Sequence, residues 1–126
     1  MDLPGSGEKV LSSSVTADHK VLFTTYLPEI DSVACSAAEG TGAVYAVSVL
    51  NGAPVIDLYE PGTTTALTIE DRSRILNHAG IPVSTSVLFP ETGDATFVVG
   101  TEKLREFKLD ELRRRTFWQE KIEEDS

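Results

Sequence analysis

The sequence predicts a mainly β protein built from antiparallel strands. Segments rich in β-branched and aromatic residues recur along the chain, and short polar or glycine-containing stretches separate them. The 126 residues are enough for one ordinary domain, and the apolar fraction of 40% is typical of globular proteins. At most one short helix is expected, near residues 69–78.

The first expected element is a hairpin over residues 8–26. Its second strand is "KVLFTTY", which follows the turn-like "TADHK" and the partner segment "EKVLSSSVT". Asp18 and His19 lie near the tip, so His19 is expected to be an exposed turn residue. Residues 27–42 lack sustained alternation, which predicts a long surface loop and a candidate contact surface.

A second hairpin is expected around "AVYAVSVL", residues 43–50. Both faces of this strand are largely apolar, which predicts that it is covered on both sides. Asn51-Gly52 predicts a type I′ turn, because both residues tolerate positive φ. Pro54 is then expected at the start or edge of a returning strand, "VIDLY".

The next segment predicts a loop, a weak helix and another hairpin. Residues 59–68 resume loop character and form a second candidate contact surface. "IEDRSRILNHAG" allows a short helix with Ile69, Ile75 and Leu76 as apolar contacts, ended by Gly80 and Pro82. "PVSTSVLF" and "ATFVVGTE" then predict two strands joined by "PETGD", and His78 beside them is expected to be a capping or surface residue.

The C-terminal end allows two interpretations. Strands are preferred for residues 97–120, and the alternative is one charged helix over residues 109–123. Residues 1–120 would then form the folded unit, and residues 121–126 a frayed acidic tail. Acidic residues, namely Glu102 just before it and Glu106, Asp110 and Glu111 within it, interrupt the basic stretch "KLREFKLDELRRR", so we expect a solvated mixed-charge face without a ligand.

Charge and composition disfavour several classes of function. The net charge of -9 disfavours a nucleic-acid partner. Cys35 is the only cysteine, so no intrachain disulfide forms. The first ten residues lack the pattern of a signal peptide, and no apolar run approaches the ~18 residues of a membrane span.

The common templates for chemistry also lack a match, so no catalytic, cofactor-binding or metal-binding residue is expected. "GSGEK" lacks the spacing of a phosphate loop, and Gly40 and Gly42, which start a G-x-G, are interpreted as turn glycines. Two histidines and one cysteine are too few for a structural zinc site, and no calcium loop or nucleophile elbow is found. The sequence therefore predicts a protein that is not an enzyme.

The order of several short motifs resembles the C-terminal end of the β-propeller region of the PilC/PilY family of type IV pilus tip proteins. These motifs are "GEKVLSSSVTADHKVLFTTYLP", "EGTGAVYAVSVLNGAPV", "DRSRILNHAGIPVSTSVLF", "VVGTE" and "RRRTFWQE". The residues that match the family's pattern are architectural: Phe23, Thr24, Thr25, Cys35, Gly40, Gly42, Tyr45, Ala46, Asn51, Gly52, Gly80, Ile81, Pro82, Gly100, Thr101 and Trp118.

The resemblance implies an incomplete propeller with a role in pilus assembly and in attachment of the cell to surfaces. It implies a location at the cell surface, on the pilus or at the outer membrane, with pilus components or a surface receptor as partners. The family's calcium-binding acidic loop does not appear here, so no cofactor is expected. A propeller needs about four to eight blades of roughly 40 to 50 residues, so the chain is expected to be part of a longer propeller.

Two alternatives stay open. The strand and turn around Tyr45 are also similar to the repeats of quinoprotein dehydrogenase propellers, although the tryptophan that follows the glycine in those repeats is missing. This similarity implies a fragment of a propeller oxidoreductase. The other alternative is a generic β-sheet interaction module with no role in pili.

Overall fold

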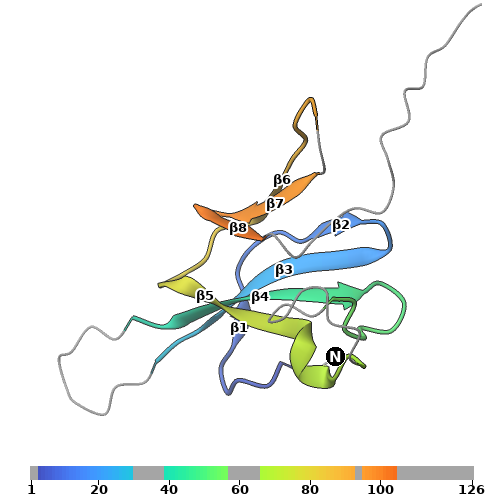
Figure 1. The fold of residues 1–126 in the computed structure, drawn as a ribbon. Helices are drawn as coiled ribbons and strands as arrows, with labels where there is room; N and C mark the ends of the chain where they lie inside the picture. Colours follow the sequence, from blue (N-terminus) through green and yellow to red (C-terminus); the bar gives the residue numbers. More distant parts are fainter. Residues whose placement is uncertain (1–2, 30–38, 57–65, 93–94, 105–126) are drawn as a thin grey trace, which may run out of the picture.

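The structure is a computed structural model that describes residues 3–29, 39–56, 66–92 and 95–104. Within these ranges the chain is mainly β, all strand pairs are antiparallel, and the helical residues form one 3-10 turn (Figure 1). The mainly β, antiparallel prediction is therefore confirmed. The elements are β1 (Lys9–Val10), β2 (Val15–Ala17), β3 (Lys20–Leu27), β4 (Thr41–Ser48), η1 (Ile69–Arg72), β5 (Ser73–Ala79), β6 (Thr85–Leu88), β7 (Thr96–Val99) and β8 (Glu102–Leu104).

The first sheet contains β1 to β5, with β3 and β4 at its centre. β3 pairs with β4 along its whole length, and its other edge pairs with β1 near one end and β2 near the other. The expected partner segment of β3 is thus divided in two. Between β1 and β2, the side-chain hydroxyl of Ser12 hydrogen-bonds the hydroxyl of Thr24, which is buried.

A tight turn of the type I′ class joins β2 to β3. Ala17 pairs with Lys20, and the two residues between them, Asp18 and His19, have φ values of 48° and 58°. Positive φ at both central positions is what a type I′ turn requires. The prediction of an exposed His19 at a hairpin tip is confirmed, because the His19 side chain lies almost fully in solvent.

The segment after β4 differs from the predicted hairpin. Asn51 has no positive φ, whereas Gly52 has φ 67°, so the type I′ prediction for this pair is wrong. Ser48 N–H instead donates to Ala53 C=O at 2.9 Å, which closes a longer loop over residues 49–52. Up to residue 56, the described part of the expected returning strand makes one isolated bridge, between Val47 and Pro54, and the proline has no N–H to donate to a ladder. Residues 57–59 of that prediction lie outside the described residues.

The partner on the other edge of β4 is β5, in the segment where a helix is the weak expectation. Only residues 69–72 are helical, as the 3-10 turn η1, and residues 73–79 form a strand. Leu76 is buried as expected, but Ile69 and Ile75 are exposed. The apolar spacing for a helix is incomplete, while the strand gains ladder hydrogen bonds along the edge of β4, which explains the difference.

The second sheet is a meander of β6, β7 and β8. The expected hairpin between residues 82–89 and 95–102 is confirmed in its pairing of β6 with β7. The second of these segments is shorter than predicted, because Gly100 (φ 60°) and Thr101 form a two-residue turn into β8. Glycine with positive φ in the first central position is the requirement of a type II′ turn.

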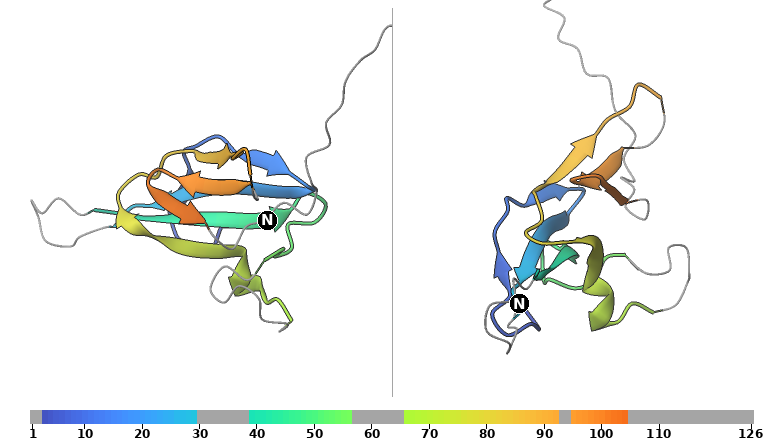
Figure 2. Two further views of the ribbon diagram at one scale, coloured as in Figure 1. Left: turned by 45° about the horizontal axis from the view of Figure 1, so that its top comes forward. Right: turned by 90° about the vertical axis from the view of Figure 1, so that its left-hand side faces the viewer.

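The two sheets pack as separate layers, with the core between them (Figure 2). In the first sheet, Leu22 lies opposite Ala46 and points to the same face. Phe97 of the second sheet is fully buried against this face. The buried apolar residues of this cluster are Leu22, Val44, Ala46, Leu76, Phe97, Val99 and Leu104.

The outer face of the first sheet carries an aromatic pair and a carboxylate. The rings of Phe23 and Tyr45 stack with centroids 5.1 Å apart and an angle of 7° between the planes. Glu8 Oε1 accepts the Tyr45 hydroxyl at 2.9 Å and the Thr25 hydroxyl at 2.6 Å, while Oε2 accepts Gly5 N–H at 3.1 Å. Burial, with a smaller contribution from Glu8, raises the pKa of Tyr45 from 10.0 to about 12.

Candidate functional site

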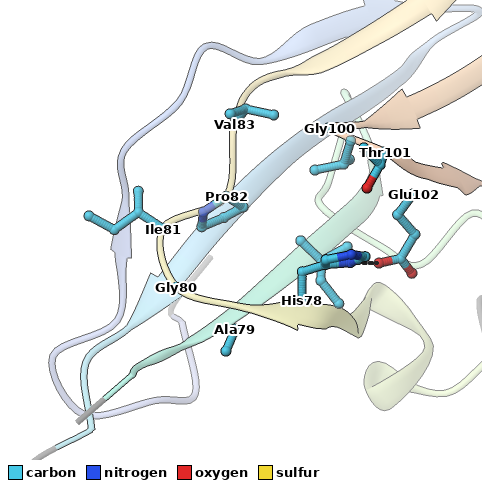
Figure 3. A pocket seen from close by; sticks show the side chains of 11 residues that line it. His78, Ala79, Gly80, Ile81, Pro82, Val83, Gly100, Thr101 and Glu102 are labelled. Carbon is cyan, nitrogen blue, oxygen red and sulfur yellow. Dashed lines mark ion pairs between the residues drawn. The ribbon is translucent and has the colours of Figure 1, made fainter. Parts of the chain in front are cut away.

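A pocket of about 230 Å³ lies where β5, the connection to β6 and the β7–β8 turn meet (Figure 3). It therefore lies at the junction of the two sheets. Its walls are mostly apolar, and its polar side chains are those of His78, Thr101 and Glu102. The lining residues are Leu76, His78, Ala79, Gly80, Ile81, Pro82, Val83, Val99, Gly100, Thr101 and Glu102.

Glycine and proline shape the backbone around the pocket. Gly80, which follows the last residue of β5, has φ 95°, a backbone conformation that residues with a side chain rarely adopt. Its N–H donates to Gly40 C=O at 2.8 Å. The chain then turns through Pro82, whose ring lies 3.3 Å from the place that a Cβ on Gly42 would occupy. The connection therefore lies against β4, and the pocket lies between the connection and the β7–β8 turn.

A bulge in β5 lies beside the polar end of the pocket, where Glu102 is found. Thr41 pairs with Ala79 and Ala43 with Ile75, so three residues of β5 lie opposite Gly42 alone. Extra residues in one strand leave backbone groups without a ladder partner. The N–H of Asn77, which lies in this bulge, donates instead to Glu102 Oε2 at 3.0 Å.

Glu102 is the most buried charge at the pocket, with only 9% of its side chain exposed. Its Oε1 accepts Arg74 Nη2 at 3.0 Å and Asn77 Nδ2 at 3.1 Å. The pair with Arg74 balances the carboxylate charge, and a buried charge needs such a partner. His78 Nδ1 lies 4.0 Å from Glu102 Oε2, which is an ion-pair distance but too long for a hydrogen bond, and the His78 side chain is largely exposed (Figure 3).

The arrangement is suited to bind a small group with an apolar body. An engineered cavity of about 150 Å³ holds benzene, whereas pockets for drug-sized ligands span roughly 300–1,000 Å³. At about 230 Å³, this pocket fits one ring or one branched aliphatic side chain. Glu102 Oε2 accepts one described donor, so it keeps an acceptor position for a ligand.

Comparison with protein-family models, with curated proteins and with solved structures gives no match to this chain.

The structure brings some of the sequence-predicted motif residues into the pocket and leaves others elsewhere. Gly80, Ile81, Pro82, Gly100 and Thr101 line it. The remaining described ones lie in or beside the first sheet and do not line the pocket: Phe23, Thr24, Thr25, Gly40, Gly42, Tyr45, Ala46, Asn51 and Gly52.

Gly40 and Gly42 are not turn glycines, which corrects the sequence interpretation. Neither has positive φ, and Gly42 lies within β4. A Cβ on Gly40 would lie 2.5 Å from both Leu27 C=O and the Tyr26 ring. These glycines are therefore required because the backbone approaches its neighbours closely.

His78 is a surface residue, as predicted, but its role differs from a cap. Its side chain is 73% exposed and borders the pocket. Glu102 is not among the residues that the sequence analysis selects. No signal within the sequence connects it to Asn77, because 25 residues separate the two positions.

Several predictions concern residues outside the described ranges. These include Cys35, Trp118, the strands expected after residue 104, the tail over residues 121–126 and most of the two candidate contact loops. The loop expected over residues 27–42 is shortened at both ends, because Leu27 belongs to β3 and Thr41 to β4. Of the loop over residues 59–68, the described residues 66–68 are exposed.

Two further features concern metals and membranes. Within the described ranges, no three or more His, Cys, Asp and Glu side chains gather as a metal site would need. The helical residues of the same ranges form no segment with the length and hydropathy needed to cross a bilayer.

Proposed function

We propose that this chain is a non-catalytic contact module of a type IV pilus assembly or adhesion protein. In this proposal its two sheets are neighbouring blades of a propeller that the rest of a longer chain completes. The module works at the cell surface, where its pocket and loops contact pilus components or a surface receptor. No cofactor takes part.

The observation that carries the contact role is the pocket between β5 and the β7–β8 turn. Ile81 and Val83 at its edge are 65% and 57% exposed, although both are large apolar side chains. Exposed apolar residues around a concave site are typical of binding surfaces. Burial of these side chains against a partner would contribute favourable free energy to binding.

The propeller part of the proposal is supported by the width of the first sheet. Across its width this sheet has four positions, namely the shared edge of β1 and β2, then β3, β4 and β5. Propeller blades are four-stranded antiparallel sheets. The pilus part is supported by the order of the sequence motifs, which covers nearly the whole chain.

A binding experiment with matched variants tests the contact role. The purified chain is mixed with pili sheared from the source cells and sedimented. We expect the chain to sediment with the pili and Val83→Glu to reduce its bound fraction at least fivefold. Val49→Glu is the control, because Val49 is similarly exposed at 51% but lies in the loop after β4. Equal loss in both variants would contradict a role for the pocket.

A genetic experiment tests the pilus assignment. Deletion of the gene that encodes this chain is expected to lower pilus number and twitching. Unchanged piliation and adhesion would remove the assignment. A generic interaction module would then be the better proposal, since the pocket supports partner binding independently of the motif order.

A further inference from the structure

We propose that the pocket takes the side chain of a tyrosine from a partner protein, with its ring among the apolar walls and its hydroxyl donating to Glu102 Oε2. This inference rests on the proposed contact function and names the chemistry of the partner. Three properties of the pocket lead to it: its size, the acceptor position on Glu102 Oε2 and the cationic partner that Glu102 already has.

The size of the pocket favours one six-membered ring. The volume of about 230 Å³ exceeds that of cavities known to hold benzene and is below the range for drug-sized ligands. The walls that would contact a ring are apolar, including Leu76, Pro82 and Val99. A ring buried there would bring a large apolar area out of water, as aromatic anchors at interfaces do.

The hydrogen-bonding capacity of Glu102 favours a ring that carries a donor. An ionised carboxylate offers about four acceptor positions. Within the described residues, Oε1 accepts two donors, from Arg74 and Asn77, and Oε2 accepts only the Asn77 N–H. His78 Nδ1 lies 4.0 Å from Oε2, which is an ion-pair distance but longer than a hydrogen bond, so one position on Oε2 accepts no hydrogen bond from a described residue.

The charge balance favours a neutral donor over a cation. Arg74 Nη2 lies 3.0 Å from Glu102 Oε1, so the carboxylate already has a cationic partner before a ligand enters. A lysine or arginine head group would bring a second cation to a carboxylate that is already paired with one. A phenol donates one hydrogen bond, carries no charge near neutral pH and has an apolar body, so it meets all three requirements.

Titration of the full chain with two small probes tests the inference. Backbone amide NMR spectra are recorded with p-cresol, which is the tyrosine side chain with its hydroxyl, and with toluene, which has the same ring without it. We expect p-cresol to shift the amide signals of residues 78–81 and 99–102. We also expect p-cresol to bind at least about fivefold more tightly than toluene, because toluene has no hydroxyl to donate a hydrogen bond to the charged Glu102. Absence of p-cresol binding, shifts confined to other surfaces, or equal affinities would overturn the inference.

Substitutions at two positions of the pocket, Glu102 and Val83, test the inference separately. Glu102→Gln is expected to lower the preference for p-cresol over toluene to twofold or less. Val83→Phe is expected to fill the pocket and abolish the p-cresol shifts, because Val83 Cγ2 lies 3.5 Å from the Cβ position of Gly100. Val49→Phe is the matched control and is expected to keep them. If both phenylalanine variants bind p-cresol equally, the pocket is not the site.

A last arm distinguishes a side chain from a free phenol. N-acetyl-tyrosinamide is expected to shift the same amides as p-cresol. Binding of p-cresol without binding of the tyrosine amide would overturn the assignment to a partner's side chain. These NMR outcomes do not depend on pili, so they separate failure of this inference from failure of the pilus assignment.

Discussion

The carboxylate of Glu102 accepts the backbone N–H of Asn77 at 3.0 Å, which ties the second sheet to the bulge of the first. The bulge lies where three residues of β5 face Gly42, so ordinary ladder pairing is interrupted there. The Asn77 N–H, which lies where the ladder is interrupted, is instead bonded by a side chain from the other sheet. The Glu102 side chain also lines the pocket, so the same carboxylate makes the hydrogen bond between the sheets and forms part of the candidate site.

Removal of this tie is expected to destabilise the fold. Glu102→Ala should lower the free energy of unfolding by about 1–3 kcal/mol, because the Asn77 N–H and the Arg74 guanidinium both lose a buried acceptor. Urea unfolding followed by circular dichroism measures the change. Glu91→Ala, at an exposed position between β6 and β7, is the control and should change stability by less than about 0.5 kcal/mol. Equal effects of the two substitutions would contradict the tie.

Gly40 and Gly42 are expected to differ in their tolerance of alanine. A Cβ on Gly40 would lie 2.5 Å from the Leu27 carbonyl oxygen, whereas one on Gly42 would lie 3.3 Å from the Pro82 ring. Gly40→Ala should therefore cost about 2–3 kcal/mol, and Gly42→Ala clearly less. Thermal unfolding of both variants checks the order, and a smaller loss for Gly40→Ala would show that the backbone around it relaxes.

The raised pKa of Tyr45 predicts a loss of stability at high pH. Folding raises this pKa from 10.0 to about 12, so the folded state holds the phenolic proton more tightly than the unfolded state does. The stabilisation is complete below pH 10 and is lost as the pH rises through 12. Absorbance at 295 nm should show one of the three tyrosines ionising last. Tyr45→Phe should remove that last step; if the step persists, another tyrosine is responsible.

The turn between β2 and β3 predicts a stabilising substitution. His19 has φ 58°, which glycine adopts without the steric conflict of a Cβ. His19→Gly should stabilise the protein by about 0.5–1 kcal/mol, and His19→Val should destabilise it by about 1–2 kcal/mol, because a β-branched side chain is strained there. The same urea experiment measures both, and an equal response would contradict a left-handed conformation at this residue.

The strands were the most predictable part of the structure. β3, β4, β6 and β7 coincide with segments rich in β-branched and aromatic residues, because local composition and alternation reflect burial in a sheet. β5 was missed because its sequence, "SRILNHA", has one buried apolar residue and no clear period. Its conformation depends on pairing with β4, which is a long-range contact.

The candidate site was only partly predictable. Gly80, Pro82 and Gly100 were identified as architectural residues, and they do shape the backbone around the pocket. The contribution of Glu102 was not predictable, since its partners come from a different sheet. Turn residues have local signatures, whereas a side chain that completes another strand's hydrogen bonds has none.

By itself, the sequence determined that the chain forms antiparallel strands separated by glycine and polar turns, because these preferences act between near neighbours. Only the tertiary structure decided which strands pair, that Asp18 and His19 adopt the type I′ turn in place of Asn51 and Gly52, and that a pocket opens beside Glu102. These features arise from packing between segments distant in the chain, where the close approach of one backbone to another selects the conformation.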